Sequence, residues 1–296
     1  MSFIALDWGT TSFRAYHVGK DGAILATISA PQGILEVKGN AFDEALESRI
    51  GPWDKALPIM ASGMITSRQG WKELPYVACP ANLKSIAAAV HAHTSSQGRK
   101  IFFVPGISTR GTDGIPDVIR GEETQVFGAS QGGEEHFVTP GTHSKWIDAV
   151  DGSIMGFATY MTGEVFAVLK AHSILGRLMA GDEVEEAAFE RGVRAALKDP
   201  GGFLHRIFSA RTLALFNEMP ESHLSSYLSG QIIGTEIAHA TTHHSRSAIY
   251  RILATPALAE RYMAAMRMAG LNVQLSPPEI AVKGLQLIAR TAGLIP

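Results

Sequence analysis

The sequence contains little cysteine and no long apolar run. Its single cysteine, Cys79, excludes an intrachain disulfide bond, which fits a reducing cytoplasm, and a buried structural thiol is the expected role. No apolar stretch reaches the roughly 20 residues that a membrane-spanning helix needs. A basic segment followed by a long apolar run, the mark of a signal peptide, is also missing. We therefore expect a cytoplasmic protein without a membrane partner.

The sequence also has no large excess of positive or negative charge. The formal net charge is −2 and charged residues make up 18% of the 296 residues, so we expect no nucleic-acid partner. Neither a GxxxxGK[ST] phosphate loop nor a GxGxxG dinucleotide motif occurs. Hydrophobic residues make up 46%, which at this length suffices for two domains with separate cores. The composition is typical of a globular enzyme.

The most informative stretch is IALDWGTTSFRAYHV, which runs from Ile4 to Val18. Apolar residues that indicate a buried strand lead to Asp7, a tight Gly-Thr-Thr turn follows, and the strand pattern then resumes. Backbone N–H groups at such a turn form an anion-binding nest, and Gly9 lets a ligand approach the backbone. Asp7 is suited to hold Mg²⁺, which binds one or two carboxylates together with substrate phosphates. The stretch predicts a phosphate-binding hairpin; the alternative is an ordinary hairpin with a polar turn.

A second stretch repeats this arrangement. TPGTHSKWIDAVDG, from Thr139 to Gly152, also indicates a strand, a Gly-Thr turn and a strand. A repeated supersecondary unit suggests duplicated halves, whose two hairpins could grip the phosphates of one nucleotide. The turns differ, because His143 and Lys145 stand where the first hairpin has a threonine and a phenylalanine. The positions that align without a gap are Gly9, Thr10, Ser12 and Val18 with Gly141, Thr142, Ser144 and Val150.

Several further motifs, taken with these hairpins, resemble one known family. The first hairpin is similar to phosphate loop one of the actin-like ATPase superfamily, and most of all to carbohydrate kinases that begin with Asp-x-Gly-Thr-Thr. The whole set resembles the 2-dehydro-3-deoxygalactonokinase family through nearly the entire chain. The motifs are ASGMITSRQGW (Ala61 to Trp71), PYVACPA (Pro75 to Ala81), IRGEETQVFG (Ile119 to Gly128), TPGTHSKW (Thr139 to Trp146) and MTGEVFAVLKAHSIL (Met161 to Leu175).

The resemblance implies a fold and an activity. The fold would be α/β, the two-lobed actin-like ATPase (ribonuclease H-like) architecture, in which each lobe is a mixed sheet flanked by helices and ATP lies in the cleft between them. The expected lobes are residues 1–133 and 134–296. The activity would be phosphorylation of 2-dehydro-3-deoxy-D-galactonate to its 6-phosphate in galactonate catabolism, with ATP and Mg²⁺. The implied partners are ATP and the sugar acid, and a homodimer is left open.

The resemblance also assigns nucleotide contacts. The adenosine motif of the superfamily, normally a Gly-Gly turn after a strand, falls on residues 254–256, which are small enough to leave room for adenine or ribose. Lys145 could bring positive charge to the β- or γ-phosphate. His143 could do so when protonated, the alternative being a neutral side chain that hydrogen-bonds the turn. The expected contacts are Asp7 (with Mg²⁺), Gly9, Thr10, Thr11, Gly141, Thr142, His143, Ser144, Lys145, Ala254, Thr255 and Pro256.

The catalytic base is less clearly marked. In polyol kinases a catalytic Asp opens the helix ahead of the second hairpin, but alignment on the shared Phe-Gly places it over Gly121. The candidates are Glu122 first, Glu123 second and Asp117 third, and the base must reach a sugar hydroxyl within hydrogen-bond distance. The alternative for the glutamate pair is stabilisation of a helix N-terminus, by about 0.3–1 kcal/mol each.

The resemblance places the sugar acid near two segments. Related kinases have a polar pair after a strand that contacts the substrate, and Arg68 and Gln69 stand there. A guanidinium group can bind a carboxylate with two parallel hydrogen bonds, while the alternative for Arg68 is a solvated surface loop. Thr162 and Glu164 are expected near the substrate, where Thr162 with Gly163 would cap a helix from Glu164 to Leu175.

Other assignments stay open. A kinase of another small sugar, sugar acid or polyol has the same motifs, whereas a nucleotide-dependent chaperone or a sugar-sensing regulator would need a further domain. Further helices are expected over residues 83–93, 122–129 and 222–244. The last helix resembles the second connecting helix of the superfamily, and this resemblance implies that Gly284 is the small residue at a helix crossing. His239 and His243 would share one helix face, but no third ligand supports a metal site there.

Overall fold

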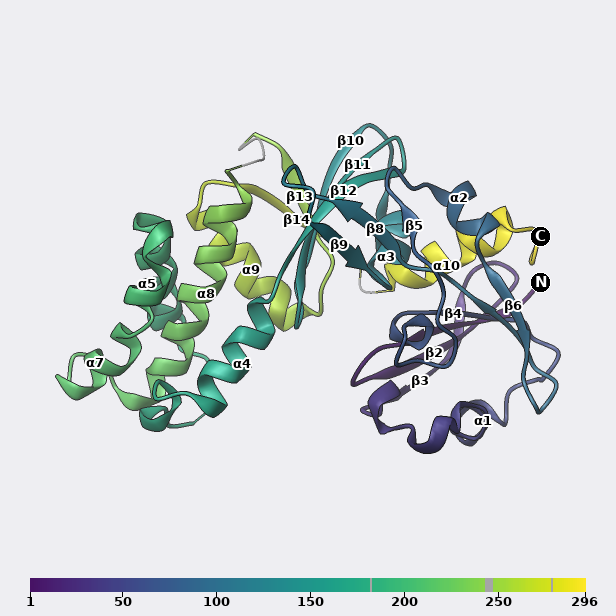
Figure 1. Cartoon of the computed structure of the whole chain (residues 1–296), viewed down its shortest axis with the longest axis horizontal. Coiled ribbons are helices and arrows are strands. Elements are labelled where there is room, and N and C mark those ends of the chain that lie inside the picture. The colour runs from purple at the N-terminus through teal and green to yellow at the C-terminus, as the bar shows by residue number, and fades with distance from the viewer. Residues whose placement is uncertain (182, 243–246, 278) are drawn as a thin grey trace. The chain divides into compact units, whose positions relative to one another are not determined.

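The computed structural model describes residues 1–181, 183–242, 247–277 and 279–296 (Figure 1). The chain forms two compact units. The first consists of residues 1–134, 148–157 and 279–296, and the second of residues 135–147 and 158–278. Within the described ranges, every helix is too short or too polar to cross a bilayer.

The first unit is built on a mixed sheet that carries the first hairpin. The hairpin strands pair antiparallel, and the first of them also pairs parallel with the next apolar strand, so the hairpin is anchored in the interior of the sheet. Ile4, Leu6 and Trp8 are almost fully buried and lie in the core of this unit. The strand order is β3 (Ile24–Ala30), β2 (Phe13–Val18), β1 (Phe3–Trp8), β4 (Ile59–Ser62), β7 (Lys100–Phe103) and β6 (His91–Thr94), with helix α1 (Phe42–Ile50) packed through Phe42 and Leu46 on the same core.

A smaller sheet of the first unit precedes the helix that carries the glutamate pair. It has the order β5 (Val77–Ala78), β8 (Ile107–Arg110) and β9 (Pro116–Ile119), and helix α3 (Glu122–Ala129) begins three residues after it. Helix α3 occupies the predicted residues 122–129. The short helix α2 (Leu83–Ala88) and the C-terminal helix α10 (Ile280–Thr291) complete the unit.

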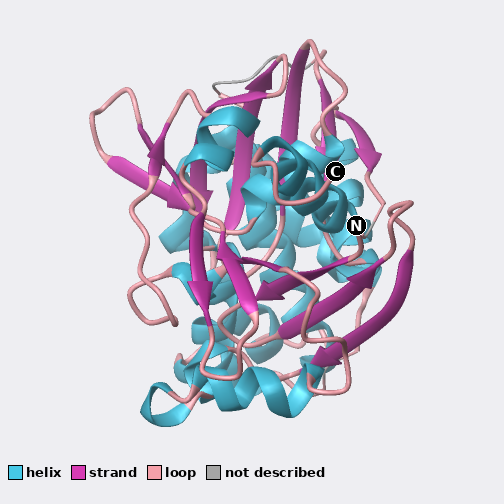
Figure 2. Ribbon diagram, turned by 90° about the vertical axis from the view of Figure 1, so that its right-hand side faces the viewer, coloured by secondary structure: helices cyan, strands magenta, loops and turns pink. Residues whose placement is uncertain are grey.

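The second hairpin belongs to another mixed sheet. Strands β10 (Glu134–Thr139) and β11 (Ser144–Val150) form it, and the sheet order is β12 (Ser153–Tyr160), β11, β10, β13 (Ile249–Ile252) and β14 (Asn272–Leu275). Val138, Trp146 and Tyr250 pack with helices in the core of the second unit. The helices of this core are α5 (Glu186–Lys198), α8 (Leu224–Ala240) and α9 (Pro256–Met268). Helices α4 (Thr162–His172), α6 (Phe203–Arg206) and α7 (Ser209–Leu215) pack with α5 and α8 in a second cluster. All six are cyan in Figure 2, and they run from teal to yellow-green in Figure 1. The predicted mixed sheets with flanking helices are confirmed.

Three helix predictions need correction. The helix expected over residues 83–93 ends at Ala88, because residues 91–94 pair antiparallel with β7 as strand β6, and sheet pairing overrides the helix propensity of the alanines. Helix α4 begins at Thr162 rather than Glu164 and ends at His172, and Thr162 does not cap it because its hydroxyl donates to Glu236. The helix expected over residues 222–244 is α8, while residues 243–246, with His243, lie outside the described residues.

Two glycines let helix α10 lie directly against helix α3. A Cβ atom on Gly284 would overlap the backbone of Thr124, and a Cβ atom on Gly128 would overlap the backbone of Ile280. The prediction that Gly284 is the small residue at a helix crossing is therefore confirmed. Because α3 begins with the two candidate glutamates, this crossing also fixes where they lie.

Replacement of Gly284 by alanine should destabilise the first unit. The added methyl group must push α10 away from α3, and overpacking of this kind costs about 1–3 kcal/mol in the free energy of unfolding. Urea denaturation measures the change. Gly201→Ala is the matched control, because open space surrounds Gly201, and it should change stability by less than about 0.5 kcal/mol. Equal stability of the two variants would contradict the prediction.

Candidate active site

The first Gly-Thr-Thr turn is braced by a glycine from outside the hairpin. The turn closes with a hydrogen bond of 2.9 Å from the Gly9 amide to the Ser12 carbonyl. Gly33 lies so close that a Cβ atom there would overlap the backbone of Thr10, and the following residue, Ile34, donates its N–H to the Gly9 carbonyl at 3.0 Å. The backbone of the predicted phosphate turn is thus held from behind.

The second turn is braced in the same way within the second unit. A Cβ atom on Gly163, in the first turn of α4, would overlap Gly141 and Thr142, and the next residue, Glu164, donates its N–H to the Thr142 carbonyl at 3.0 Å. The two hairpins therefore share more than their aligned residues, because each is held by a glycine followed by one backbone hydrogen bond. Sequence reasoning did not assign this role to Gly33 or Gly163, although each is followed by an apolar run or a helix.

The polar side chains of the second turn contact the turn itself and α4. The His143 Nε2 atom lies 2.5 Å from the Glu164 Oε2 atom, and both side chains are nearly half exposed. The Lys145 ammonium donates to the His143 carbonyl at 2.8 Å, and Lys145 is 5% exposed. The His143 ring thus contacts α4 rather than the turn, and Lys145 contacts the turn backbone. Phosphate contact by His143 and Lys145 stays a prediction.

Asp7 lies at the end of β1, beside other charged groups of the first unit. Its Oδ2 atom is 3.7 Å from Nη1 of Arg14. Burial raises the pKa of Asp7, the Arg14 guanidinium opposes this, and the negative charge of Glu122 raises that pKa further. A Cβ atom on Gly63 would lie 3.0 Å from the Asp7 Oδ1 atom, so the backbone at Gly63 packs closely against the carboxylate.

This arrangement fits a divalent cation. Two carboxylates whose charges repel match the oxygen ligands that Mg²⁺ takes from proteins. Among the residues that the structure describes, no three His, Cys, Asp or Glu side chains form a metal cluster.

The two adjacent glutamates of α3 have different environments. Glu123 is fully buried and its Oε2 atom accepts from the Gly121 amide at 2.7 Å. Among the described residues, its Oε1 atom has no hydrogen-bond partner. Burial, together with the charge of Glu122, raises the pKa of Glu123 to about 8. Glu122 is partly exposed and accepts from the Arg120 amide at 2.9 Å. A base must be ionised and reachable, so the geometry favours Glu122.

The remaining predicted side chains lie in exposed segments. Arg68 and Gln69 are both exposed, and Arg68 Nε is 3.2 Å from Oε1 of Glu73. The exposure of Arg68 agrees with the alternative, in which it belongs to a solvated surface loop. Asp117 lies in β9, where its Oδ1 atom accepts from the Val118 amide at 2.7 Å. Their roles stay predictions.

Arg120, which sequence reasoning missed, supports the start of α3 and the segment after β4. Its guanidinium donates to the Thr66 hydroxyl at 2.7 Å and to the Leu74 carbonyl at 3.2 Å, and lies 4.3 Å from the centre of the Tyr76 ring. It precedes Gly121, which faces Gly63 at backbone contact distance. The arginine within the motif IRGEETQVFG was the available signal, but only the folded chain shows that it bridges separate motifs.

The predicted adenosine turn leads into α9. Ala254 is partly buried, Thr255 is exposed at the N-cap position and Pro256 is the first residue of the helix, where its missing N–H group costs nothing. A groove lies between α4, α8 and α9, in the same unit. It consists of two adjoining cavities of about 80 and 100 Å³ that share Phe166 and Arg261 as lining residues.

Replacement of Glu123 by glutamine should flatten the pH dependence of stability. Between the ordinary pKa of 4.5 and about 8, the folded protein keeps a proton on Glu123 that the unfolded chain loses. Unfolding then releases a proton, so the free energy of unfolding falls as pH rises through this window. A neutral glutamine keeps the contact with the Gly121 amide and removes the fall. Urea denaturation at a series of pH values measures the slope, with Glu190→Gln on α5 as the control. A slope in Glu123→Gln that equals that of the wild type would refute the assignment.

Comparison with known proteins agrees with the motifs. The sequence profile of the family described as 2-keto-3-deoxy-galactonokinase matches residues 7–288. A protein from Rhizobium meliloti (strain 1021) named 2-dehydro-3-deoxygalactonokinase is 35% identical over 97% of this chain and 96% of its own length. The 2-dehydro-3-deoxygalactonokinase of Escherichia coli (strain K12) is 31% identical over 97% of each chain. A crystal structure of a 2-dehydro-3-deoxygalactonokinase protein from Sinorhizobium meliloti superposes with a TM-score of 0.90 at 35% identity, covering 97% of this chain and 98% of that one. The chain therefore belongs to the 2-keto-3-deoxy-galactonokinase family.

Proposed function

We propose that the protein transfers the γ-phosphoryl group of ATP to 2-dehydro-3-deoxy-D-galactonate and so forms the 6-phosphate. The observation that carries this proposal is the family match over residues 7–288, combined with two phosphate turns that are braced alike. In this proposal, each of the two units carries one phosphate turn. The turns at Gly9 to Thr11 and at Gly141 to Lys145 hold phosphate oxygens through backbone N–H groups.

The carboxylates of the first unit carry out the chemistry in this proposal. Asp7, beside Glu122, would hold Mg²⁺, and the bound ion neutralises negative charge on the phosphoryl group. Glu122 takes the proton from the attacking hydroxyl of the sugar acid, since it is the more accessible glutamate. Arg68 and Gln69 bind the substrate, with Thr162 and Glu164 near it. Phosphate charge near His143 would compete with Glu164 for the imidazole.

The groove between α4, α8 and α9 is suited to the nucleoside part of ATP. It begins at Gly141 in the second turn and extends past Gly163 to Lys170 along α4. Seven residues of helix span roughly 10 Å, a length that fits a nucleoside extending from its phosphates. The inner cavity has apolar walls, including Leu258, and the outer cavity has polar groups.

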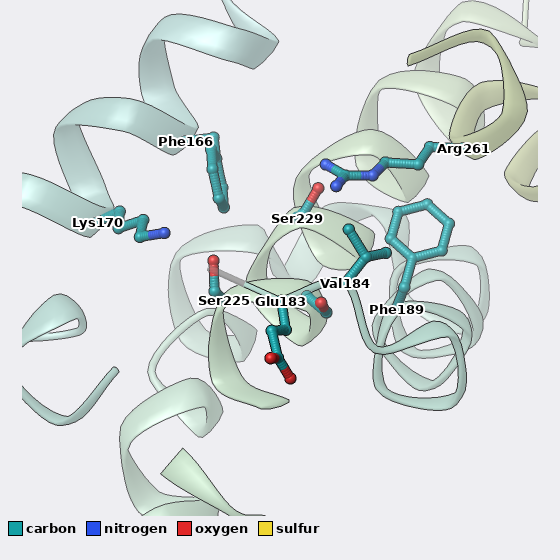
Figure 3. Close-up of a pocket in the computed structure, with 9 residues that line it drawn as sticks. Phe166, Lys170, Glu183, Val184, Phe189, Ser225, Ser229 and Arg261 are labelled. Carbon is teal, nitrogen blue, oxygen red and sulfur yellow. The ribbon is translucent and has the colours of Figure 1, made fainter. Parts of the chain in front are cut away.

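The outer end of the groove offers both an aromatic face and charge. Figure 3 shows the Phe166 ring and the Arg261 guanidinium pointing into one space beside Ser229, and the Lys170 ammonium directed toward it from α4. A flat heteroaromatic base stacks on such a ring, and serine hydroxyls and cations can hydrogen-bond its edge or the ribose. We propose that Phe166 packs on the adenine ring.

Replacement of Phe166 by alanine should raise the KM for ATP about tenfold, because loss of one stacking contact costs about 1–3 kcal/mol by analogy with base–aromatic stacking. The KM for the sugar acid should stay within about twofold of the wild-type value. Initial rates at varied ATP and varied sugar acid separate the two constants. Phe216→Ala, at an exposed position after α7, is the matched control. An unchanged KM for ATP in Phe166→Ala would exclude this groove as the base site.

The experiment that tests the activity is ADP release with single substrates. 2-Dehydro-3-deoxy-galactonate, its gluconate epimer, glycerol and a no-substrate control are compared in the presence of ATP and Mg²⁺. We expect strong stimulation by the galactonate compound. Stimulation by the epimer or by glycerol instead would assign another kinase activity, and steady hydrolysis without any stimulation would refute the sugar-acid kinase.

The same assay with Glu122→Gln tests the base. Loss of general-base catalysis should lower kcat by roughly 10²–10⁴-fold and leave the KM for ATP within about twofold. Glu123→Gln is the matched control, because the buried neighbour should keep most of the activity. A kcat that survives in Glu122→Gln and falls in Glu123→Gln would exchange their roles.

A further inference from the structure

A buried carboxylate of α8 accepts hydrogen bonds from residues of three other elements. Glu236 is 3% exposed and belongs to none of the motifs discussed so far. Its Oε1 atom accepts from the Ser144 hydroxyl at 2.7 Å and from the Trp146 indole N–H at 2.8 Å. Its Oε2 atom accepts from the Tyr262 hydroxyl at 2.7 Å and from the Thr162 hydroxyl. Each oxygen therefore has two donors, the full complement of a carboxylate.

The four donors place Glu236 behind the second phosphate turn. Ser144 is the first residue of β11, directly after the turn, and Thr162 is the first residue of α4. The turn also depends on α4, because Gly163 packs against Gly141 and the Glu164 amide donates to Thr142. The carboxylate of Glu236 therefore ties together the two segments whose mutual position sets the shape of the turn.

A buried carboxylate such as Glu236 is costly to desolvate, so its presence needs an explanation. Burial raises the pKa of Glu236, and the hydrogen bonds from Thr162, Ser144, Tyr262 and Trp146 oppose that rise. A purely apolar residue could fill this place in the core of the unit without the cost of desolvating a carboxylate. An apolar residue cannot hold four hydrogen-bond donors in one geometry. Two of these donors lie next to the predicted phosphate site, so the carboxylate can influence the geometry of that site.

We propose that Glu236 is a positioning residue for the nucleotide phosphates: it holds Ser144 and Thr162 at once and so keeps the backbone N–H groups of the second turn in their binding geometry. The inference rests on the proposed ATP site. Glu236 itself touches no substrate in this proposal. Its effect reaches the phosphates through the turn at Gly141 to His143, and the bracing by Gly163 is the connection.

The hydrogen-bond chemistry predicts which replacement rescues the site. The indole of Trp146 can only donate, so the Oε1 position must remain an acceptor. The hydroxyls of Thr162 and Tyr262 can also accept, so a glutamine that places its carbonyl at Oε1 and its NH₂ at Oε2 preserves all four contacts. Glu236→Gln is therefore the conservative variant, Glu236→Leu removes every contact, and Glu236→Asp retains a carboxylate one methylene too short to reach both pairs.

The matched control removes a hydroxyl contact that the same helix makes elsewhere. The Tyr160 hydroxyl lies 2.9 Å from Nδ1 of His239, near the C-terminal end of α8. Tyr160→Phe loses that contact without touching Ser144 or Thr162. It reports what a lost hydrogen bond at α8 does to stability when the phosphate turn is left intact.

The test measures binding of ATP, ADP and adenosine by calorimetry, together with thermal unfolding and the separate KM values for ATP and sugar acid. In Glu236→Leu and Glu236→Asp we expect the Kd for ATP and ADP to rise at least about tenfold, because small misplacement of a positioned group is costly. The Kd for adenosine should rise less than the Kd for ATP, because Thr162 and Tyr262 line the proposed nucleoside groove but only the turn binds phosphate in this proposal. Glu236→Gln and Tyr160→Phe should bind ATP like the wild type.

Each outcome decides the inference. If Glu236→Leu does not fold, Glu236→Asp carries the same comparison. Lower thermal stability with an unchanged ratio of ATP to adenosine affinity would assign Glu236 a structural role only and overturn the proposal. ATP binding that is as weak in Glu236→Gln as in Glu236→Leu would also overturn it, because the hydrogen bonds would not be the cause. A wild type that binds no ATP would refute the proposed function and this inference with it, whereas a wild type that binds ATP but phosphorylates another sugar would leave the inference standing.

Discussion

The site depends above all on the close approach of one backbone to another, which only glycine permits. Gly33 presses on the first turn and Gly163 on the second, and in each case the next residue donates its N–H to a turn carbonyl. A Cβ atom at either place would overlap backbone rather than a mobile side chain, so the chain has no simple way to relax. A turn braced in this way keeps its N–H groups directed at one spot before a ligand arrives, which lowers the ordering cost of binding phosphate.

The same constraint acts at the helix crossings that place the carboxylates. Gly284 and Gly128 bring α10 onto α3, and Gly192 and Gly230 bring α5 onto α8. Each crossing supports a helix with a glutamate of interest, Glu122 on α3 or Glu236 on α8. Tight backbone contact leaves the helices little freedom to shift, so packing of the helices helps to fix where these glutamates lie.

The three carboxylates then differ in burial and in hydrogen bonding. Glu122 and Glu123 are neighbours in the chain, yet one is partly exposed and the other fully buried with a pKa of about 8. Glu236 is as deeply buried as Glu123 but has four donors, whereas Glu123 has an oxygen without a partner. The residue type is the same in all three cases, so the differences in exposure, in pKa and in the number of hydrogen-bond donors come from the surroundings.

The sequence by itself determined the elements whose signal is local. The two hairpins and the helix from Glu122 to Ala129 follow from apolar periodicity, turn residues and the repeated Gly-Thr motif. The glycine at the last helix crossing was implied by the family resemblance. Tertiary structure alone decided the features that depend on contacts between residues far apart in the chain. Residues 91–94 form a strand because they pair with β7. Thr162 does not cap its helix because its hydroxyl donates to Glu236. Burial and hydrogen bonding between segments far apart in the chain leave no local pattern, so only the folded chain could assign them.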